Sequence, residues 1–156
     1  MSTIIFDIEG NNLREKITKV WCIATYNLEE NKYVSFMPEE IEDGLAYLSS
    51  ANNLVGHGII GFDLPALSKL HSFHPSSNII DTLILSRLEN PDRETPLGCS
   101  SGAHSVEAWA LRLRLKQLKV EHEDWSIFTP EMLHRCETDV VIQTEIYKHL
   151  KGVMGL

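Results

Sequence analysis

The sequence lacks any apolar run near the roughly 20 residues that a membrane-spanning helix requires. It also lacks the basic start and apolar stretch of a signal peptide, because Asp7 and Glu9 come directly after the first residues. The cysteines, Cys22, Cys99 and Cys136, are odd in number and match no zinc or CxxC spacing. We therefore expect a soluble cytoplasmic protein with reduced thiols and no membrane partner.

Basic residues are also few, because 14 Lys and Arg against 22 Asp and Glu give a net charge of −8. Proteins that coat nucleic acid without specificity are usually basic, so the charge disfavours this class. It is compatible with an enzyme that meets nucleic acid through metal ions, since bound cations reverse the local charge of an acidic site. A chain of 156 residues, of which 43% are hydrophobic, suits one globular domain over residues 1–156.

Apolar runs bounded by turn residues predict four short strands. These strands are residues 4–9, 20–26, 32–36 and 53–57. Helical spacing of apolar residues and capping residues predict five helices. The helices are residues 39–50, 64–70, 105–114 and 130–150, with one more that begins at Asp81. An antiparallel meander followed by a strand and helices predicts an α/β fold with three layers.

The first candidate for chemistry is the pair Asp7 and Glu9 at the end of the first strand. Residues two apart on a strand point to the same face, so the two carboxylates lie together. Two like charges that close repel each other unless a cation joins them. The pattern is frequent, however, and taken alone it favours a solvated strand face.

The second candidate is Asp63, which follows a buried strand and a glycine-rich loop. A simple explanation is that Asp63 caps the next helix, which stabilises a helix by about 1 kcal/mol. Capping does not explain Gly56, Gly58 and Gly61, because glycines allow a ligand or another backbone to approach closely. The third candidate is Asp139, which lies in an otherwise apolar part of the last helix. A buried carboxylate needs a partner, and a salt bridge to Lys or Arg is the alternative to a metal ion.

Three segments, in order, resemble the motifs of the DEDD exonucleases, also called DnaQ-like, in the version with a histidine in the third motif. These segments are Phe6–Glu9, His57–Asp63 and His134–Asp139. Two more segments are similar to the proofreading exonuclease domains of family A DNA polymerases from phages, namely Ile80–Leu83 and Ala103–Trp109. The resemblance covers nearly the whole chain. It implies an RNase H-like fold with a mixed sheet of about five strands flanked by helices, here as a free-standing exonuclease.

This resemblance implies a metal-dependent 3′–5′ exonuclease that releases mononucleotides from single-stranded ends. Two Mg²⁺ or Mn²⁺ ions would bind four carboxylates, those of Asp7, Glu9, Asp63 and Asp139. Such ions prefer carboxylate oxygens, and a pair of them activates water and stabilises the leaving oxygen. The expected partners are single-stranded DNA or frayed 3′ ends, with RNA as a second substrate, and a separate polymerase.

By the same resemblance, His134 would take the proton from the attacking water. Arg135 is better aligned with Asp139 on a regular helix, but a guanidinium cannot accept a proton. We therefore expect His134 to lie on an irregular or mobile first turn. The residues expected to contact substrate are His57, Phe62 and Arg135.

Two positions depart from the family pattern. Arg135 stands where the phage domains usually have a tyrosine, and Gly58 stands where the family often has an asparagine. Both departures favour a rival hypothesis, a non-catalytic module that binds nucleic-acid ends, whereas the intact set of four acids opposes it. A third hypothesis is an RNase H-like endonuclease.

Other residues are assigned ordinary roles. Arg112, Lys116 and Lys119 fall at helical spacing, and we expect a solvated face rather than contacts with phosphate. Trp125 is expected in the core rather than as a stacking platform for bases.

Overall fold

The computed structural model describes residues 1–13 and 15–156, in which five strands form one mixed sheet. The strands are β1 (Thr3–Gly10), β2 (Val20–Asn27), β3 (Lys32–Phe36), β4 (Asn53–Gly56) and β5 (Asn78–Asp81). Their order is β3-β2-β1-β4-β5, with β2 antiparallel to β1 and β3, and with β4 and β5 parallel to β1. The predicted mixed sheet is confirmed. Sequence patterns did not locate β5, because it has only four residues and runs directly into a helix.

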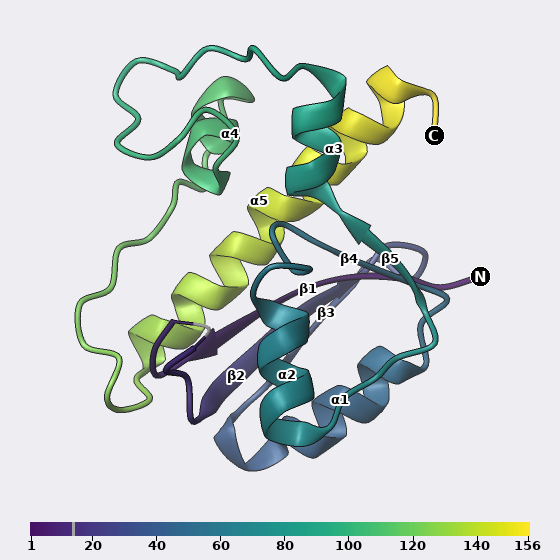
Figure 1. The fold of residues 1–156 in the computed structure, drawn as a ribbon, viewed down its shortest axis with the longest axis vertical. Helices are drawn as coiled ribbons and strands as arrows, with labels where there is room; N and C mark the ends of the chain where they lie inside the picture. The colour runs from purple at the N-terminus through teal and green to yellow at the C-terminus, as the bar shows by residue number, and fades with distance from the viewer. Residues whose placement is uncertain (14) are drawn as a thin grey trace.

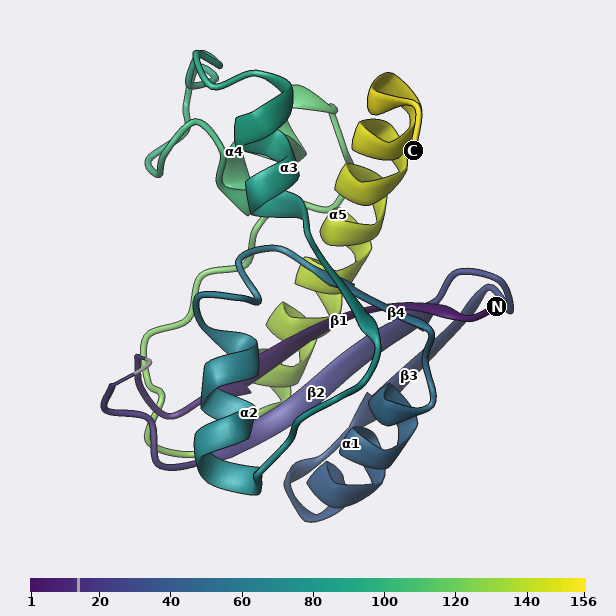
Figure 2. The same cartoon turned by 45° about the vertical axis from the view of Figure 1, so that its right-hand side comes forward.

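The described residues also form one 3₁₀ helix and five α-helices. They are η1 (Pro38–Glu40), α1 (Ile41–Ser49), α2 (Asp63–His71), α3 (Thr82–Glu89), α4 (Val106–Arg112) and α5 (Pro130–Met154). Helices α1 and α2 cover one face of the sheet and α5 covers the other, as Figures 1 and 2 show from two directions. The three-layer α/β arrangement predicted for an RNase H-like fold is therefore confirmed. Among the described residues, none of the helices has the length and apolar character needed to cross a bilayer.

The alternation of side chains along β1 decides where its two acids point. Ile4, Phe6 and Ile8 are buried in the cluster that includes residues of α1 and α2. Ile5 is buried in a second cluster with Val140 of α5. Because successive side chains on a strand alternate between faces, the odd-numbered acids of β1 lie on the same side as Ile5, towards α5.

Helices α3 and α4 pack against the C-terminal half of α5 around the fully buried Trp109. From α4 the chain returns to the start of α5 through residues 113–129, which we call the crossing segment (Figure 1). The crossing segment is attached to the sheet, since Trp21 Nε1 donates a hydrogen bond to the carbonyl oxygen of Trp125 at 2.9 Å. It therefore passes beside the end of β1 that carries the acidic residues.

Candidate metal centre

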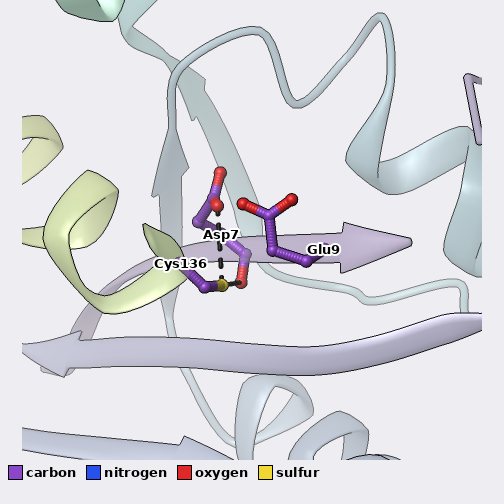
Figure 3. A group of neighbouring side chains, drawn as sticks. All are labelled: Asp7, Glu9 and Cys136. Carbon is purple, nitrogen blue, oxygen red and sulfur yellow. Dashed lines mark hydrogen bonds between the residues drawn. The ribbon is translucent and has the colours of Figure 1, made fainter. Parts of the chain in front are cut away.

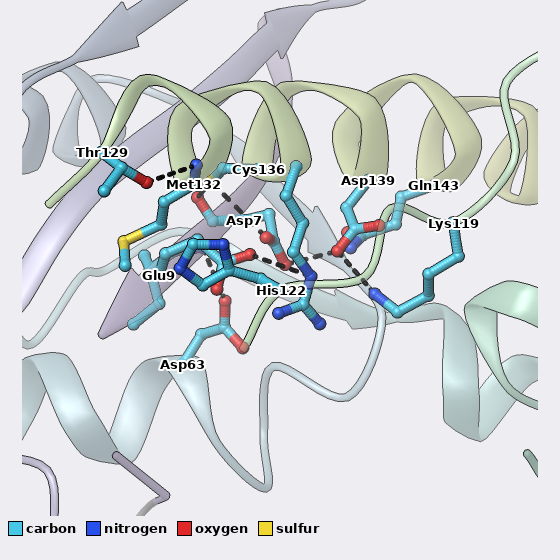
Figure 4. Close-up of polar contacts among 12 residues, drawn as sticks. Asp7, Glu9, Asp63, Lys119, His122, Thr129, Met132, Cys136, Asp139 and Gln143 are labelled. Atoms are coloured by element: carbon cyan, nitrogen blue, oxygen red, sulfur yellow. Dashed lines mark hydrogen bonds and ion pairs between the residues drawn. The ribbon is translucent and has the colours of Figure 1, made fainter. Parts of the chain in front are cut away.

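The four predicted carboxylates line one cavity of about 650 Å³. They come from three elements: Asp7 and Glu9 from β1, Asp63 from the first position of α2, and Asp139 from the middle of α5. In Figure 4 these side chains gather between α5 and the start of α2. Tertiary structure thus brings together four acids that are spread over more than 130 residues of sequence.

Asp7 is held in place from α5. Its Oδ1 accepts a hydrogen bond from Gln143 Nε2 at 3.1 Å, and Cys136 Sγ lies 3.3 Å from its carbonyl oxygen and 3.5 Å from its Oδ2. One potential ligand atom from each of Asp7, Glu9 and Cys136 lies within 4.8 Å of the others (Figure 3). Sequence reasoning missed both helix residues, although they lie three before and four after Asp139, the spacing that places side chains on one helix face.

Asp63 does not act as the helix cap that the sequence suggested as an alternative. The N-cap position of α2 belongs to Phe62, and Asp63 is the first helical residue. Its Oδ2 instead accepts a hydrogen bond from the backbone N–H of Ile8 at 3.2 Å. The contact holds the start of α2 against β1 at Ile8, the residue between Asp7 and Glu9.

Two cations also reach the cavity. Lys119 Nζ lies 2.8 Å from Asp139 Oδ2, and Arg135 Nε lies 3.9 Å from Glu9 Oε1. The Arg135 guanidinium stacks 4.6 Å from the ring centroid of Trp125, which also lines the cavity. The expectations of a solvated face for Lys119 and a core position for Trp125 are therefore corrected. Sequence spacing could not reveal either contact, because the crossing segment has no helical or strand period.

Burial and mutual repulsion raise the pKa values of these acids. Burial first, and then the charge of Asp139, raise the pKa of Asp7 to about 7. Burial and the charge of Asp7 raise the pKa of Glu9 to about 8. The same two causes raise the pKa of Asp63 well above its ordinary value. The cluster therefore resists full ionisation unless added positive charge stabilises it.

The donor set fits a divalent ion. Asp139 Oδ1 is buried and has no hydrogen-bond partner within the described chain, so one acceptor in the cavity is unsatisfied. A buried carboxylate oxygen without a partner is costly, and a hard cation would satisfy it. Three carboxyl groups with raised pKa values and a fourth with an unsatisfied oxygen therefore match the oxygen ligands that Mg²⁺ and Mn²⁺ prefer.

These pKa values predict how the stability of the metal-free protein depends on pH. Because the folded pKa values of Asp7 and Glu9 lie near 7 and 8, above the ordinary 3.8 and 4.5, their stabilising contribution is complete below those ordinary values. It is lost as the pH rises through the folded values, by at most about 1.4 kcal/mol per pH unit for each proton. In EDTA, the melting temperature should therefore fall between pH 6.5 and 8. Excess Mn²⁺ should flatten this dependence, and equal slopes with and without the ion would contradict the prediction.

His57 reaches the cavity wall, but its ring is engaged elsewhere. Its Nε2 lies 2.6 Å from the carbonyl oxygen of His104 and its Nδ1 lies 2.8 Å from Thr82 Oγ1. The carbonyl can only accept, so Nε2 donates to it and Nδ1 accepts from the hydroxyl. Burial lowers the pKa of His57 to about 4, which keeps the ring neutral. The ring thus ties the β4–α2 loop to α3 and to the segment just before α4, and contact of His57 with substrate stays a prediction.

Asp81 organises the glycine-rich loop that leads to Asp63. Its Oδ1 accepts hydrogen bonds from the N–H groups of Gly58 at 2.8 Å and Leu83 at 2.9 Å, and its Oδ2 accepts from Ile60 N at 3.0 Å. Gly58 has a φ of 77°, in the left-handed region that glycine, and among other residues asparagine, tolerates best. The departure from asparagine at this position therefore preserves the backbone conformation.

His134 is not brought to the carboxylates. It lies within α5, which begins at Pro130 with Thr129 as its cap, so the predicted irregular turn is wrong. His134 is exposed and lines a separate cavity of about 310 Å³, together with Glu137. The physical reason is helix geometry, since residues five apart diverge by about 140°. Arg135 and Phe62, by contrast, line the cavity that holds the four acids.

Comparison with known proteins identifies both sequence relatives and structural neighbours. No protein-family model matches the chain. It is 31% identical to the DNA-directed DNA polymerases of Enterobacteria phage T3 and Escherichia phage T7, in each case over 186 aligned residues that cover 94% of this chain. The chain spans 26% of the length of either polymerase, so it corresponds to about a quarter of these relatives.

Solved structures share the fold at low sequence identity. Brucella melitensis NrnC bound to pGG has a TM-score of 0.70 at 15% identity, over 96% of this chain and 72% of that one. NrnC with bound Mg²⁺ gives 0.67 at 16% identity, with the same coverage. Escherichia coli Exonuclease I in complex with a dT13 oligonucleotide gives 0.61 at 13% identity, over 96% of this chain and 41% of that one.

Proposed function

We propose that this chain, which shares its fold with NrnC and Exonuclease I, is a metal-dependent 3′–5′ exonuclease of the DnaQ-like type acting on single-stranded DNA ends. The observation that carries the proposal is the convergence of Asp7, Glu9, Asp63 and Asp139 on one cavity. Sequence similarity to phage DNA polymerases over 94% of the chain supports DNA as the substrate. A structural neighbour with bound Mg²⁺ supports dependence on a divalent ion.

We propose that Asp7, Glu9 and Asp139 hold one ion and that Asp7 and Asp63 hold a second. Ions bound there would supply an activated water and neutralise charge on the phosphate and the leaving oxygen. The chain's own contribution is to position the ligands. Gln143 orients the Asp7 carboxylate and the N–H of Ile8 orients that of Asp63. Such preorganisation is worth most in a cavity from which water is largely excluded.

The size of this cavity and the burial of its acids support a single-stranded end as the substrate. The volume of about 650 Å³ lies in the range that accommodates a small ligand such as one nucleotide. Asp63 and Asp139 are each 4% exposed, so the scissile phosphate must enter the cavity to meet them. A paired end would have to melt first, which costs about 1–2 kcal/mol per base-pair step. Blunt duplex should therefore be cut more slowly than single strands.

Digestion of 5′-labelled single strands of DNA and RNA, with Mg²⁺, Mn²⁺ or EDTA, tests the proposal. We expect a ladder that shortens from the 3′ end in either ion and no cleavage in EDTA. Circular single-stranded DNA is the matched control, because it has no end. Cleavage of the circle would identify an endonuclease, and binding of linear strands without any cleavage would identify a non-catalytic module.

The two neighbouring basic positions on α5 should behave differently. Arg135→Ala removes a guanidinium from the cavity wall and should raise KM about tenfold, because a hydrogen bond to a charged group contributes about 1.5–3 kcal/mol. His134→Ala removes an exposed side chain from a different cavity and should change kcat less than about threefold. Steady-state kinetics on a short single strand separates the two effects. Loss of turnover in His134→Ala with normal KM would instead restore His134 as the base.

A further inference from the structure

Lys119 is the cation in closest contact with the carboxylate cluster among the described residues. Its Nζ lies 2.8 Å from Asp139 Oδ2, and Figure 4 shows the ammonium group beside that carboxylate. Its charge also lowers the pKa of both Asp7 and Glu9, although burial outweighs this effect. Lys119 is therefore a counter-charge for the cluster as a whole. A divalent ion bound to Asp139 would offset the same negative charge.

The way in which Lys119 is joined to the fold allows its ammonium group to move away from Asp139. The residue belongs to the crossing segment, which connects α4 to α5 without regular structure in the described chain. The segment is attached six residues further on, where Trp125 accepts the hydrogen bond from Trp21 and stacks on Arg135. The ammonium itself is joined to the cluster through a flexible four-carbon side chain that is 23% exposed. Breaking the contact with Asp139 therefore requires no change in the sheet or in α5.

We propose that Lys119 is an internal cation that competes with divalent ions for the carboxylate cluster, so that metal binding and release of Lys119 from Asp139 form one coupled exchange. The inference rests on the proposed function, since it takes these carboxylates as the metal ligands. An ion bound to Asp139 and an ammonium on the same carboxylate carry like charges at close range and repel each other. The apparent metal affinity equals the intrinsic affinity multiplied by the fraction of molecules in which the cluster is free of Lys119.

This competition would regulate the nuclease. In the metal-free protein Lys119 stabilises the acidic cluster, and the site stays closed to ions at low concentration. When the ion concentration rises, the ammonium is displaced and the cluster becomes competent. The concentration of Mg²⁺ or Mn²⁺ needed for activation is thus set by the chain itself, through one lysine outside the ligand set.

Mn²⁺ binding without nucleic acid tests the proposal directly. Free Mn²⁺ can be followed by electron paramagnetic resonance during titration of the wild type, Lys119→Met, Lys119→Arg and Lys116→Met. Removing the competing charge should lower the Kd of Lys119→Met about tenfold, which is the effect of a competitor that occupies about nine-tenths of the sites. Lys119→Arg should stay near wild type. Lys116→Met, an equal charge change at an exposed lysine, should also stay near wild type.

The outcomes separate this inference from the proposed function. Unchanged or weaker Mn²⁺ binding in Lys119→Met overturns the competition, while the carboxylate site itself stands. No Mn²⁺ binding by the wild type overturns the metal site and with it the proposed function. A measurement on the wild type avoids any folding defect of the variant: acetylation of Lys119, read by mass spectrometry relative to Lys116, should rise several-fold on adding Mn²⁺. Equal acetylation with and without Mn²⁺ would also overturn the competition.

Discussion

Asp7→Asn is expected to lower kcat on a single-stranded DNA substrate by about 10³-fold or more. Asp7 sits between Glu9 and α5, where Gln143 and Cys136 contact it, and in the proposed site it is the ligand shared by both ions. Asparagine keeps the size and one oxygen but removes the charge. Loss of the metal-dependent stabilisation of the transition state, which is worth several kcal/mol, corresponds to at least this factor.

The same variant should lose its response to metal in thermal unfolding. An ion at 100 times its Kd stabilises the wild type by about 2.7 kcal/mol, and Asp7→Asn should show little of this increase. In EDTA the variant should be at least as stable as the wild type near pH 8, because one of the mutually repelling acids is gone. Asp43→Asn, the same change at an exposed position of α1, is the control. Retained activity in Asp7→Asn would exclude the proposed two-ion site.

The second large effect is expected at Asp81, which lies outside the metal cavity. Asp81→Ala removes the acceptor of three backbone N–H groups, those of Gly58, Ile60 and Leu83. A buried donor left without a partner costs about 1–3 kcal/mol, and water can reach part of this loop. We expect a loss of about 3–4 kcal/mol in the free energy of unfolding, or roughly 10 °C in melting temperature.

Asp81→Ala should also reduce turnover at temperatures where it is folded, because the loop held by Asp81 carries Phe62 and Asp63 into the cavity. Urea unfolding measures the stability, and kinetics at saturating Mn²⁺ measure the turnover. Asp92→Ala removes an exposed aspartate from the loop after α3 and serves as the matched control. A variant at Asp81 with wild-type stability and turnover would show that the three hydrogen bonds do not determine the loop conformation.

The sequence predicted four of the five strands and the shared face of Asp7 and Glu9, because both depend on local patterns. Side chains alternate between the two faces of any strand, so the pattern in Thr3–Gly10 predicted that Asp7 and Glu9 share a face without knowledge of the neighbouring strands. Turn residues and a capping Thr129 likewise located the later helices. β5 was not predicted, because a strand of four residues that continues directly into a helix gives too short a pattern.

The assignment of His134 to the site came from motif resemblance and went against helix geometry. The motif resemblance carried over a histidine five residues before Asp139, and only an irregular turn could have aligned it with that acid. The structure begins α5 at Pro130, so the regular helix turns His134 outwards and places Arg135 on the cavity wall. Met132 and Cys136 are buried in the core, which fixes the face that this helix presents to the sheet.

The sequence by itself indicated the α/β class, four of the five strands and the five α-helices, because backbone period is carried by neighbours in the chain, whereas motif resemblance selected the four acids. Only the tertiary structure decided which groups surround those acids. Lys119 and Trp125 approach them through a crossing segment without a period, and Gln143 does so across the sheet–helix interface. Burial also sets the charge state of the cluster, since desolvation is the largest cause of the raised pKa values of Asp7, Glu9 and Asp63. Desolvation exists only after the chain has folded, so no reading of the sequence could supply it.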